Sequence, residues 1–351
     1  MTPGGAGVAP RHPDRPHPET VAAGSAPAGT DPVGDDLAAY LRAQATEFLR
    51  ALRAQREHGN GAEGAAEAGR ALRRSARRIS AALHTFRALL DPGWADSMRP
   101  ELAWVSGTLA LEHSQEARLD RLLLALHRLS GSTPVPVGAV VHAGGPAPAP
   151  ERGSLTVGAA KAGALLERRI TLARTRAHSA ALEALGSARF HAVADRIALL
   201  ASDVPLAPGA SRAGLGPLAA AAEDRLAGAV SVLPLVTAGD PYNAQALVHG
   251  LSPDPAPHPQ DGPWHQVRLL LRLHRYAREI PHTAPADPRL RPAAEALTRH
   301  RDAAEAAAEA AQAARTPRIA PATAYALGVL HADQRHEVEA ARFTFQHTWQ
   351  S

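Results

Sequence analysis

Cysteine is absent from this 351-residue sequence, which excludes disulfides and thiolate metal sites. Aromatic residues make up only 4% of the chain, so leucine, alanine and valine must fill any hydrophobic core. Such a composition favours helices that pack through small and medium-sized side chains over a β-sandwich.

Lysine and long apolar runs are also scarce. Lys161 is the only lysine, so arginine supplies nearly all of the positive charge, and the formal net charge is +4. A surplus of this size identifies a polyanion-binding protein only if the charges cluster. The most apolar stretch, residues 226–236, is too short to span a bilayer and contains a proline. Residues 1–20 lack the apolar segment of a secretory signal. We therefore expect a cytoplasmic protein that has no membrane partner.

Stretches rich in proline and glycine divide the chain. Residues 1–34 carry no periodicity and predict a disordered tail, and residues 132–155 predict a long irregular loop. Residues 203–217 form the strongest internal boundary and predict a linker. About four helical segments lie on each side of it, which predicts a first helical bundle over 35–202 and a second over 218–351. No strand or hairpin pattern is present, so the predicted fold class is all-α.

One predicted helix carries an unusual density of positive charge. Residues 69–78 read GRALRRSARR. From Leu72 to Leu90, apolar residues recur every three or four positions and form a face that predicts burial in a core. The basic side chains lie beside this face and beyond it, and we call them the first stripe: Arg70, Arg73, Arg74, Arg77 and Arg78.

A similar layout recurs in the other half of the chain. In residues 264–280, four basic side chains fall within about 80° on a helical wheel, opposite an apolar face. We call them the second stripe: His265, Arg268, Arg272 and Arg275. A duplicated bundle with one cationic helix per copy explains the shared layout. The two stripes should then face a common groove, where a long polyanion would contact both.

Neither stripe segment contains aspartate or glutamate between its basic residues. Aligned guanidinium groups repel one another, and an external polyanion would supply the missing counter-charge. Arginine suits phosphate because its planar fork donates two hydrogen bonds to two oxygens. The alternative is a solvated charged face that carboxylates of neighbouring helices compensate.

The order of these segments resembles the CHAD family, the conserved-histidine α-helical domains, over about residues 34–351. Two stretches match family motifs. Residues 70–105 resemble the first motif, with matches at Arg73, Arg77, Arg78 and Phe86. Residues 264–280 resemble the second motif, with matches at His265, Arg268, Arg272, Arg275, Tyr276 and Glu279. The resemblance implies two four-helix bundles related by a pseudo-two-fold, and inorganic polyphosphate as the ligand of a basic surface.

Three places depart from the family pattern. Arg70 stands where the first motif has its histidine, and His113-Ser114 replaces an Arg-Asp pair on the third helix. The helix that follows residue 217 carries only Arg225, whereas relatives are rich in arginine there. An arginine in place of histidine keeps the positive charge at neutral pH. The smaller number of arginines on the helix that follows residue 217 thins the basic surface.

These observations predict a non-catalytic protein that binds inorganic polyphosphate through the two stripes, without a cofactor or a metal ion. We expect it in the cytoplasm, in part at polyphosphate granules. No P-loop, dinucleotide fingerprint or nucleophile elbow is present. Two alternatives stay open. Nucleic acid is one, although few aromatic residues are available to stack on bases. A diverged helical scaffold that has lost its ligand is the other.

Overall fold

Helices make up nearly all of the chain that can be described. The computed structural model describes residues 32–57, 62–131, 150–208, 214–240, 258–280 and 287–351. Within these ranges the expected all-α class is confirmed, because pairing between extended segments is limited to one isolated antiparallel bridge between Leu90 and Leu206. Residues 1–31 of the predicted tail and 132–149 of the predicted loop lie outside the described residues.

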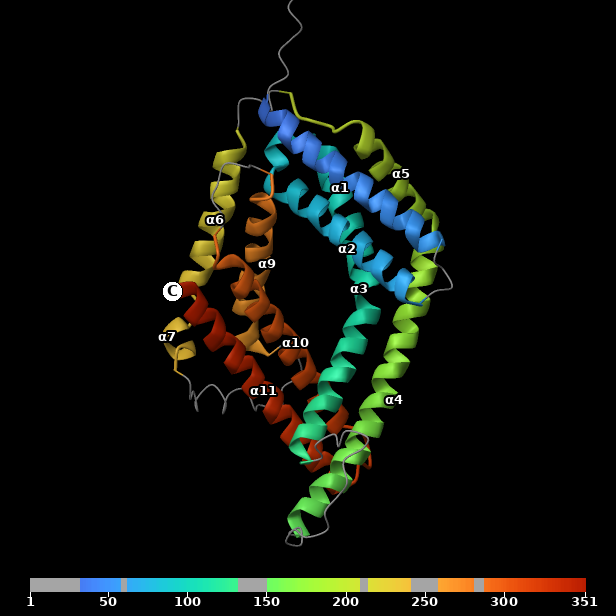
Figure 1. The fold of residues 1–351 in the computed structure, drawn as a ribbon, viewed down its shortest axis with the longest axis vertical. Coiled ribbons are helices and arrows are strands. Elements are labelled where there is room, and N and C mark those ends of the chain that lie inside the picture. The colour runs from blue at the N-terminus through green and yellow to red at the C-terminus, as the bar shows by residue number, and fades with distance from the viewer. Residues whose placement is uncertain (1–31, 58–61, 132–149, 209–213, 241–257, 281–286) are drawn as a thin grey trace, which may run out of the picture.

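Each half of the chain contributes its own set of helices (Figure 1). The first half contains α1 (Pro32–Glu57), α2 (Ala62–Thr85), α3 (Pro92–Leu129), α4 (Pro150–Gly186) and α5 (Ala188–Ser202). The second half contains α6 (Leu215–Ser231), the short α7 (Leu235–Ala238), α9 (Gly262–Ala277), α10 (Leu290–Ala314) and α11 (Pro321–Gln350). Among the described residues, no helix has the length and apolar character needed to cross a membrane.

The local sequence explains several helix ends. Asp91 caps α3, because its side chain accepts a hydrogen bond from the Trp94 backbone nitrogen at 2.7 Å. Ser187 caps α5 in the same way and separates it from α4. The predicted irregular loop over 132–155 is wrong at residues 150–155, because α4 begins at Pro150. A proline in the first helical turn costs no intrahelical hydrogen bond.

Three hydrophobic clusters hold these helices together. The first combines α1, α2, α5 and the beginning of α3. The third combines α6, α9, the beginning of α10 and the end of α11, around Trp264 and Phe345. The second cluster joins the far ends of two long hairpins, α3–α4 and α10–α11, so that the two halves share a core. At the other end of the molecule Ala277 and Ile280 pack into the first cluster.

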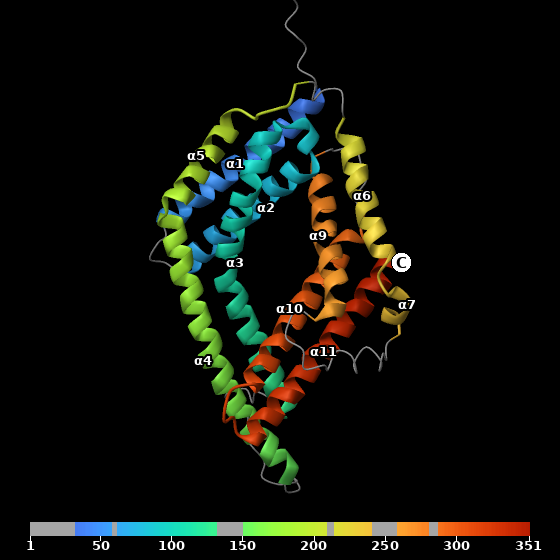
Figure 2. The same ribbon diagram turned by 180° about the vertical axis from the view of Figure 1, so that it is seen from behind.

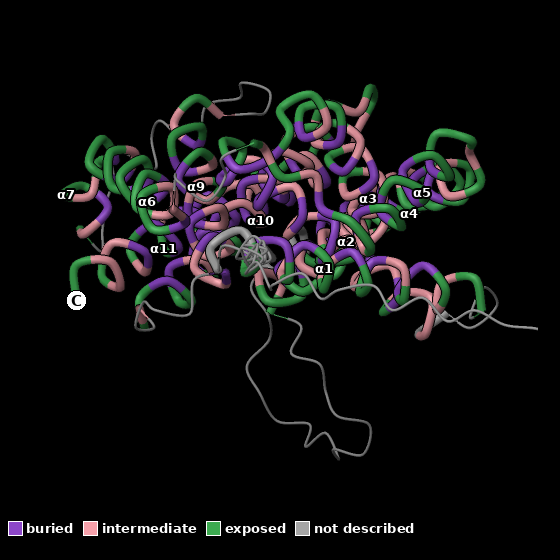
Figure 3. Tube along the Cα trace, turned by 90° about the horizontal axis from the view of Figure 1, so that it is seen from above, coloured by how far each residue is buried: buried purple, intermediate pink, exposed green. Residues whose placement is uncertain are grey.

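The halves therefore meet at two separate places, and the site lies between them. Figure 2 shows α2 and α3 on one side and α9 and α10 on the other. The end of α9 meets α2 near the first cluster, and the hairpins meet at the opposite end. Seen from above, buried residues concentrate where the helices face one another, and the outer faces of α4, α5 and α6 are mostly exposed (Figure 3).

Candidate anion-binding cavity

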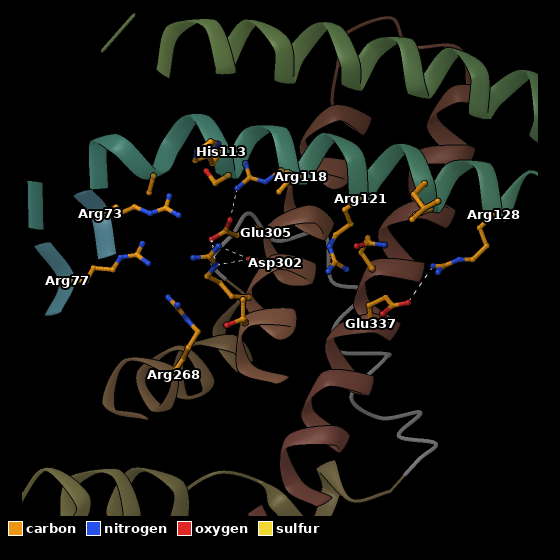
Figure 4. A pocket seen from close by; sticks show the side chains of 18 residues that line it. Arg73, Arg77, His113, Arg118, Arg121, Arg128, Arg268, Asp302, Glu305 and Glu337 are labelled. Carbon is orange, nitrogen blue, oxygen red and sulfur yellow. Dashed lines mark hydrogen bonds and ion pairs between the residues drawn. The ribbon is translucent and has the colours of Figure 1, made fainter. Parts of the chain in front are cut away.

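A cavity of about 670 Å³ lies where the two halves face each other (Figure 4). Its walls come from α2, α3, α9, α10 and α11. The charged side chains of the lining are seven arginines and three carboxylates, and they are Arg73, Arg77, Arg118, Arg121, Arg128, Arg268, Arg301, Asp302, Glu305 and Glu337. The lining is therefore predominantly cationic, and it draws on both halves of the chain.

Two arginines of the first stripe, Arg73 and Arg77, form the α2 wall and point into this space (Figure 4). Neither has a carboxylate partner among the described residues. Burial lowers the pKa of Arg77 to about 10, with smaller contributions from the neighbouring guanidinium groups of Arg73 and Arg272. The side chain stays protonated at neutral pH, and the neighbouring guanidinium groups repel its positive charge.

The second stripe supplies the facing wall. Arg268 of α9 lines the cavity opposite Arg77 (Figure 4). Burial lowers the pKa of Arg268 to about 10, with smaller contributions from Arg301 and Arg272. The Arg268 Nε atom is buried and has no hydrogen-bond partner among the described residues. Arg272 lies beside it, and burial lowers its pKa too. The structure thus brings Arg73, Arg77 and Arg268 to one space, with Arg272 next to it.

The remaining arginines of the first stripe do not line the cavity. Arg70 and Arg74 both pair with Glu67, each at 2.9 Å, and Arg78 pairs with Glu279 at 2.8 Å. The expectation that the stripe lacks internal counter-charge is wrong for these three. Glu67 lies one turn before Arg70 on the same helix, outside residues 69–78, which contain no aspartate or glutamate. Glu279 comes from the other half through tertiary packing.

Two members of the second stripe also lie away from the cavity lining. His265 faces His300, with ring centroids 5.5 Å apart, and burial lowers its pKa. Burial therefore favours its neutral form. Arg275 lines a different concavity, together with residues of α10.

The structure adds cavity residues that sequence reasoning missed. Arg118 and Arg121 come from α3, and Arg301 comes from α10. Arg118 pairs with Glu305 at 2.7 Å, and Arg301 pairs with both Asp302 (2.7 Å) and Glu305 (3.4 Å). Arg121 has no ion-pair partner in the described part of the chain. The sequence signal that could have identified Arg118 and Arg121 is their spacing, because residues three positions apart lie on the same face of a helix.

The departure at His113-Ser114 falls inside the site. Both residues line the α3 wall of the cavity. His113 lies 3.8 Å from Glu116, at its Nδ1 atom. Their position means that the altered pair belongs to the surface a ligand would contact.

A second cluster of arginines in the same half is organised differently. Arg335 and Arg342 are 3% and 4% exposed, and both donate to Asp261, at 2.8 and 2.7 Å. Arg342 Nε also donates to His300 Nε2 at 3.3 Å, and its guanidinium lies 5.3 Å from the Trp264 ring centroid. Burial and Arg342 lower the pKa of His300 to about 3, so it is neutral. Arg342 also donates to Glu339 at 2.7 Å, so two carboxylates compensate the two arginines, and the cluster fixes α10 and α11 to the start of α9.

The histidines and carboxylates do not gather into a metal site in the described ranges. No cluster of three or more histidine, aspartate or glutamate side chains there could hold a metal ion. His331 contacts the Ala307 carbonyl oxygen through Nδ1 at 2.9 Å, and Asp333 accepts from Arg128 at 2.8 Å.

Comparisons with known proteins found one family model and similar solved structures. The model of the CHAD domain family matches residues 43–280. A solved structure described as PptA from Streptomyces chartreusis is 66% identical, with a TM-score of 0.76, and the match covers 91% of this chain and 99% of that one. The crystal structure of the CHAD domain from the plant Ricinus communis is 16% identical, with a TM-score of 0.47 and coverage of 88% and 91%. A search of curated proteins found no match.

Proposed function

This chain belongs to the CHAD domain family, and we propose that it binds inorganic polyphosphate in the cavity between its two halves. One observation carries the proposal: Arg73, Arg77, Arg121 and Arg268 line a single cavity without a carboxylate partner among the described residues. Their mutual repulsion is relieved when a polyanion enters. The binding residues are drawn from both halves, so a chain of phosphates contacts both at once.

Arginine chemistry fits this ligand. Each guanidinium offers two parallel N–H donors to phosphate oxygens. Partial burial strengthens such hydrogen bonds, because fewer water molecules compete for the donors. The buried, unpartnered Nε of Arg268 is one donor that a phosphate oxygen would satisfy. Polyphosphate presents these oxygens along its whole length and needs no base recognition.

The lining favours polyphosphate over nucleic acid. No phenylalanine, tyrosine or tryptophan occurs among the described residues that line the cavity. Proteins that bind single-stranded nucleic acid combine a basic groove with aromatic side chains on which bases stack. A cavity with arginines and no such platform contacts phosphates alone.

We also propose that the protein is non-catalytic, cytoplasmic and recruited to polyphosphate granules. The three cavity carboxylates, Asp302, Glu305 and Glu337, already pair with arginines, so none of them is set up as a general base. Imaging of a fluorescent fusion in cells that accumulate polyphosphate tests the location: foci that disappear when polyphosphate synthesis is blocked are expected. Incubation with long-chain polyphosphate tests for hydrolysis, and released phosphate would contradict the non-catalytic role.

A competition titration tests the binding proposal. Purified full-length protein is titrated with long-chain polyphosphate, single-stranded DNA and duplex DNA at several salt concentrations. We expect polyphosphate to bind most tightly, with an affinity that falls steeply as salt rises, because each neutralised phosphate releases counterions. Tighter binding of either DNA, or an affinity for polyphosphate that does not change with salt concentration, would contradict the proposal.

A further inference from the structure

A second concavity adjoins the central cavity on the surface of α9 and α10. It has a volume of about 600 Å³, and we call it the α9–α10 groove. Its lining consists of Arg275, Arg291, Ala294, Glu295, Thr298 and Arg299. Thr298 also lines the central cavity, so the two spaces share a wall residue and open next to each other.

Both α9 and α10 line the central cavity with one part of the helix and the groove with another. On α9, Arg268 faces the central cavity and Arg275, two turns later, faces the groove. On α10 the order is reversed: Arg301, Asp302 and Glu305 line the cavity. Arg291, Glu295 and Arg299, which come earlier, line the groove. Both helices therefore run from the cavity to the groove, and each contributes arginines to both spaces. Seven residues of helix correspond to a path of about 10 Å.

The charge of the groove resembles that of the cavity. Arg291 pairs with Glu295 at 3.1 Å, and this pair is exposed. Arg275 and Arg299 have no ion-pair partner in the part of the chain that the structure describes. Thr298 donates its hydroxyl hydrogen to the Ala294 carbonyl oxygen at 2.8 Å. The carboxylates nearest to it along α10 are Glu295 in the groove and Asp302 in the cavity, and each already pairs with an arginine.

Resting on the proposed function, we infer that the α9–α10 groove is a second phosphate-binding subsite, which a polyphosphate chain reaches by leaving the central cavity over Thr298. The inference gives Arg275 a role distinct from that of Arg268, although both belong to the second stripe. A short chain fills the central cavity alone, and a long chain occupies both spaces. The groove therefore makes the protein selective for long chains, because the second contact is intramolecular once the first has formed.

A double variant, R275Q/R299Q, tests the subsite. The matched control is R168Q/R176Q, which removes two positive charges from exposed positions on α4, a helix that lines neither space. Wild type and both variants are titrated with long-chain polyphosphate and with tripolyphosphate at several salt concentrations. Circular dichroism checks that each variant keeps the wild-type helix content.

We expect R275Q/R299Q to weaken long-chain binding about tenfold at low salt and to lower the log–log salt slope by about two, one for each phosphate that the variant no longer neutralises. Its affinity for tripolyphosphate, and both affinities of the control, should stay within about twofold of wild type. Long-chain binding equal to the control, or an equal reduction for both ligands, would overturn the subsite. A wild-type protein that binds neither ligand would instead refute the proposed function, and the subsite with it.

Discussion

Two clusters of arginines in the same molecule have opposite surroundings. In the cluster around Asp261, Arg335 and Arg342 are almost fully buried, and the carboxylates of Asp261 and Glu339 pair with them. In the central cavity, Arg77 and Arg268 keep partial access to solvent and face other guanidinium groups. A buried charge without a partner costs several kcal/mol, so the first cluster must be complete for the fold to form. The second can stay incomplete because water reaches it, and that leaves it ready for an external anion.

Removal of the carboxylate from the buried cluster should give the largest effect. Asp261→Ala leaves Arg335 buried without a counter-charge and leaves Arg342 with Glu339 as its one carboxylate partner among the described residues, and we expect the free energy of unfolding to fall by about 3–5 kcal/mol. Urea denaturation measures it. A decrease of less than about 1 kcal/mol would mean that the cluster is not the stabilising element described here.

Acid should weaken the same cluster through His300. The unfolded chain protonates this histidine below about pH 6.5, whereas its folded-state pKa of about 3 keeps it neutral. Between these values the unfolded state binds more protons, so stability falls as the pH falls, by about 2 kcal/mol at pH 5. Denaturation at pH 7 and pH 5 measures the change.

His300→Gln should remove this part of the pH dependence, whatever it does to stability at pH 7. The control is His127→Gln, at an exposed position on α3, which should keep the wild-type pH dependence. A His300→Gln protein that loses as much stability between pH 7 and pH 5 as wild type does would show that His300 is not the responsible group.

Removal of a carboxylate from the buried cluster should lower stability, whereas removal of one from the cavity should strengthen polyphosphate binding. Glu305→Gln leaves Arg118 without an ion-pair partner among the described residues and leaves Arg301 paired with Asp302, and we expect polyphosphate affinity to rise up to about fivefold. Glu183→Gln removes the same charge from an exposed position on α4 and should change affinity less. Weaker binding by the Glu305 variant would mean that this carboxylate holds the arginines in place for the ligand.

The smallest effect is expected on the stability of the ligand-free protein when a cavity arginine is neutralised. Arg77→Gln removes a repulsive charge that has no ion-pair partner among the described residues, so the free energy of unfolding should stay within about 0.5 kcal/mol of wild type. Denaturation in a buffer free of polyanions measures it. A decrease comparable to that of Asp261→Ala would erase the distinction between the two clusters.

Much of the fold could be predicted from the sequence, because helical periodicity and capping are local properties. The apolar face from Leu72 to Leu90 is buried as expected, and Asp91 ends the segment by capping the next helix. The shared core of the two long hairpins could not be predicted. It depends on close approach between distant helices, as where Gly158 of α4 lies against the backbone of Ala322.

The residues of the candidate site could likewise be predicted only where local sequence decides their position. Spacing alone placed Arg73, Arg77 and Arg268 on cationic helix faces, and all three line the cavity. Spacing could not separate them from Arg78, because the deciding partner, Glu279, lies 201 positions away. Arg301 was missed for a similar reason: which side of α10 faces the cavity is set by the way the helices cross.

The salt dependence of polyphosphate binding by R77Q/R268Q, which removes one cavity arginine from each half, tests the central claim most directly. Compared with wild type and with the control R168Q/R176Q, this variant should bind both long-chain polyphosphate and tripolyphosphate at least about tenfold more weakly at low salt. Its log–log salt slope should be lower by about two, while its helix content is unchanged. An affinity and slope equal to those of the control would contradict the claim that the uncompensated arginines of the cavity bind the ligand.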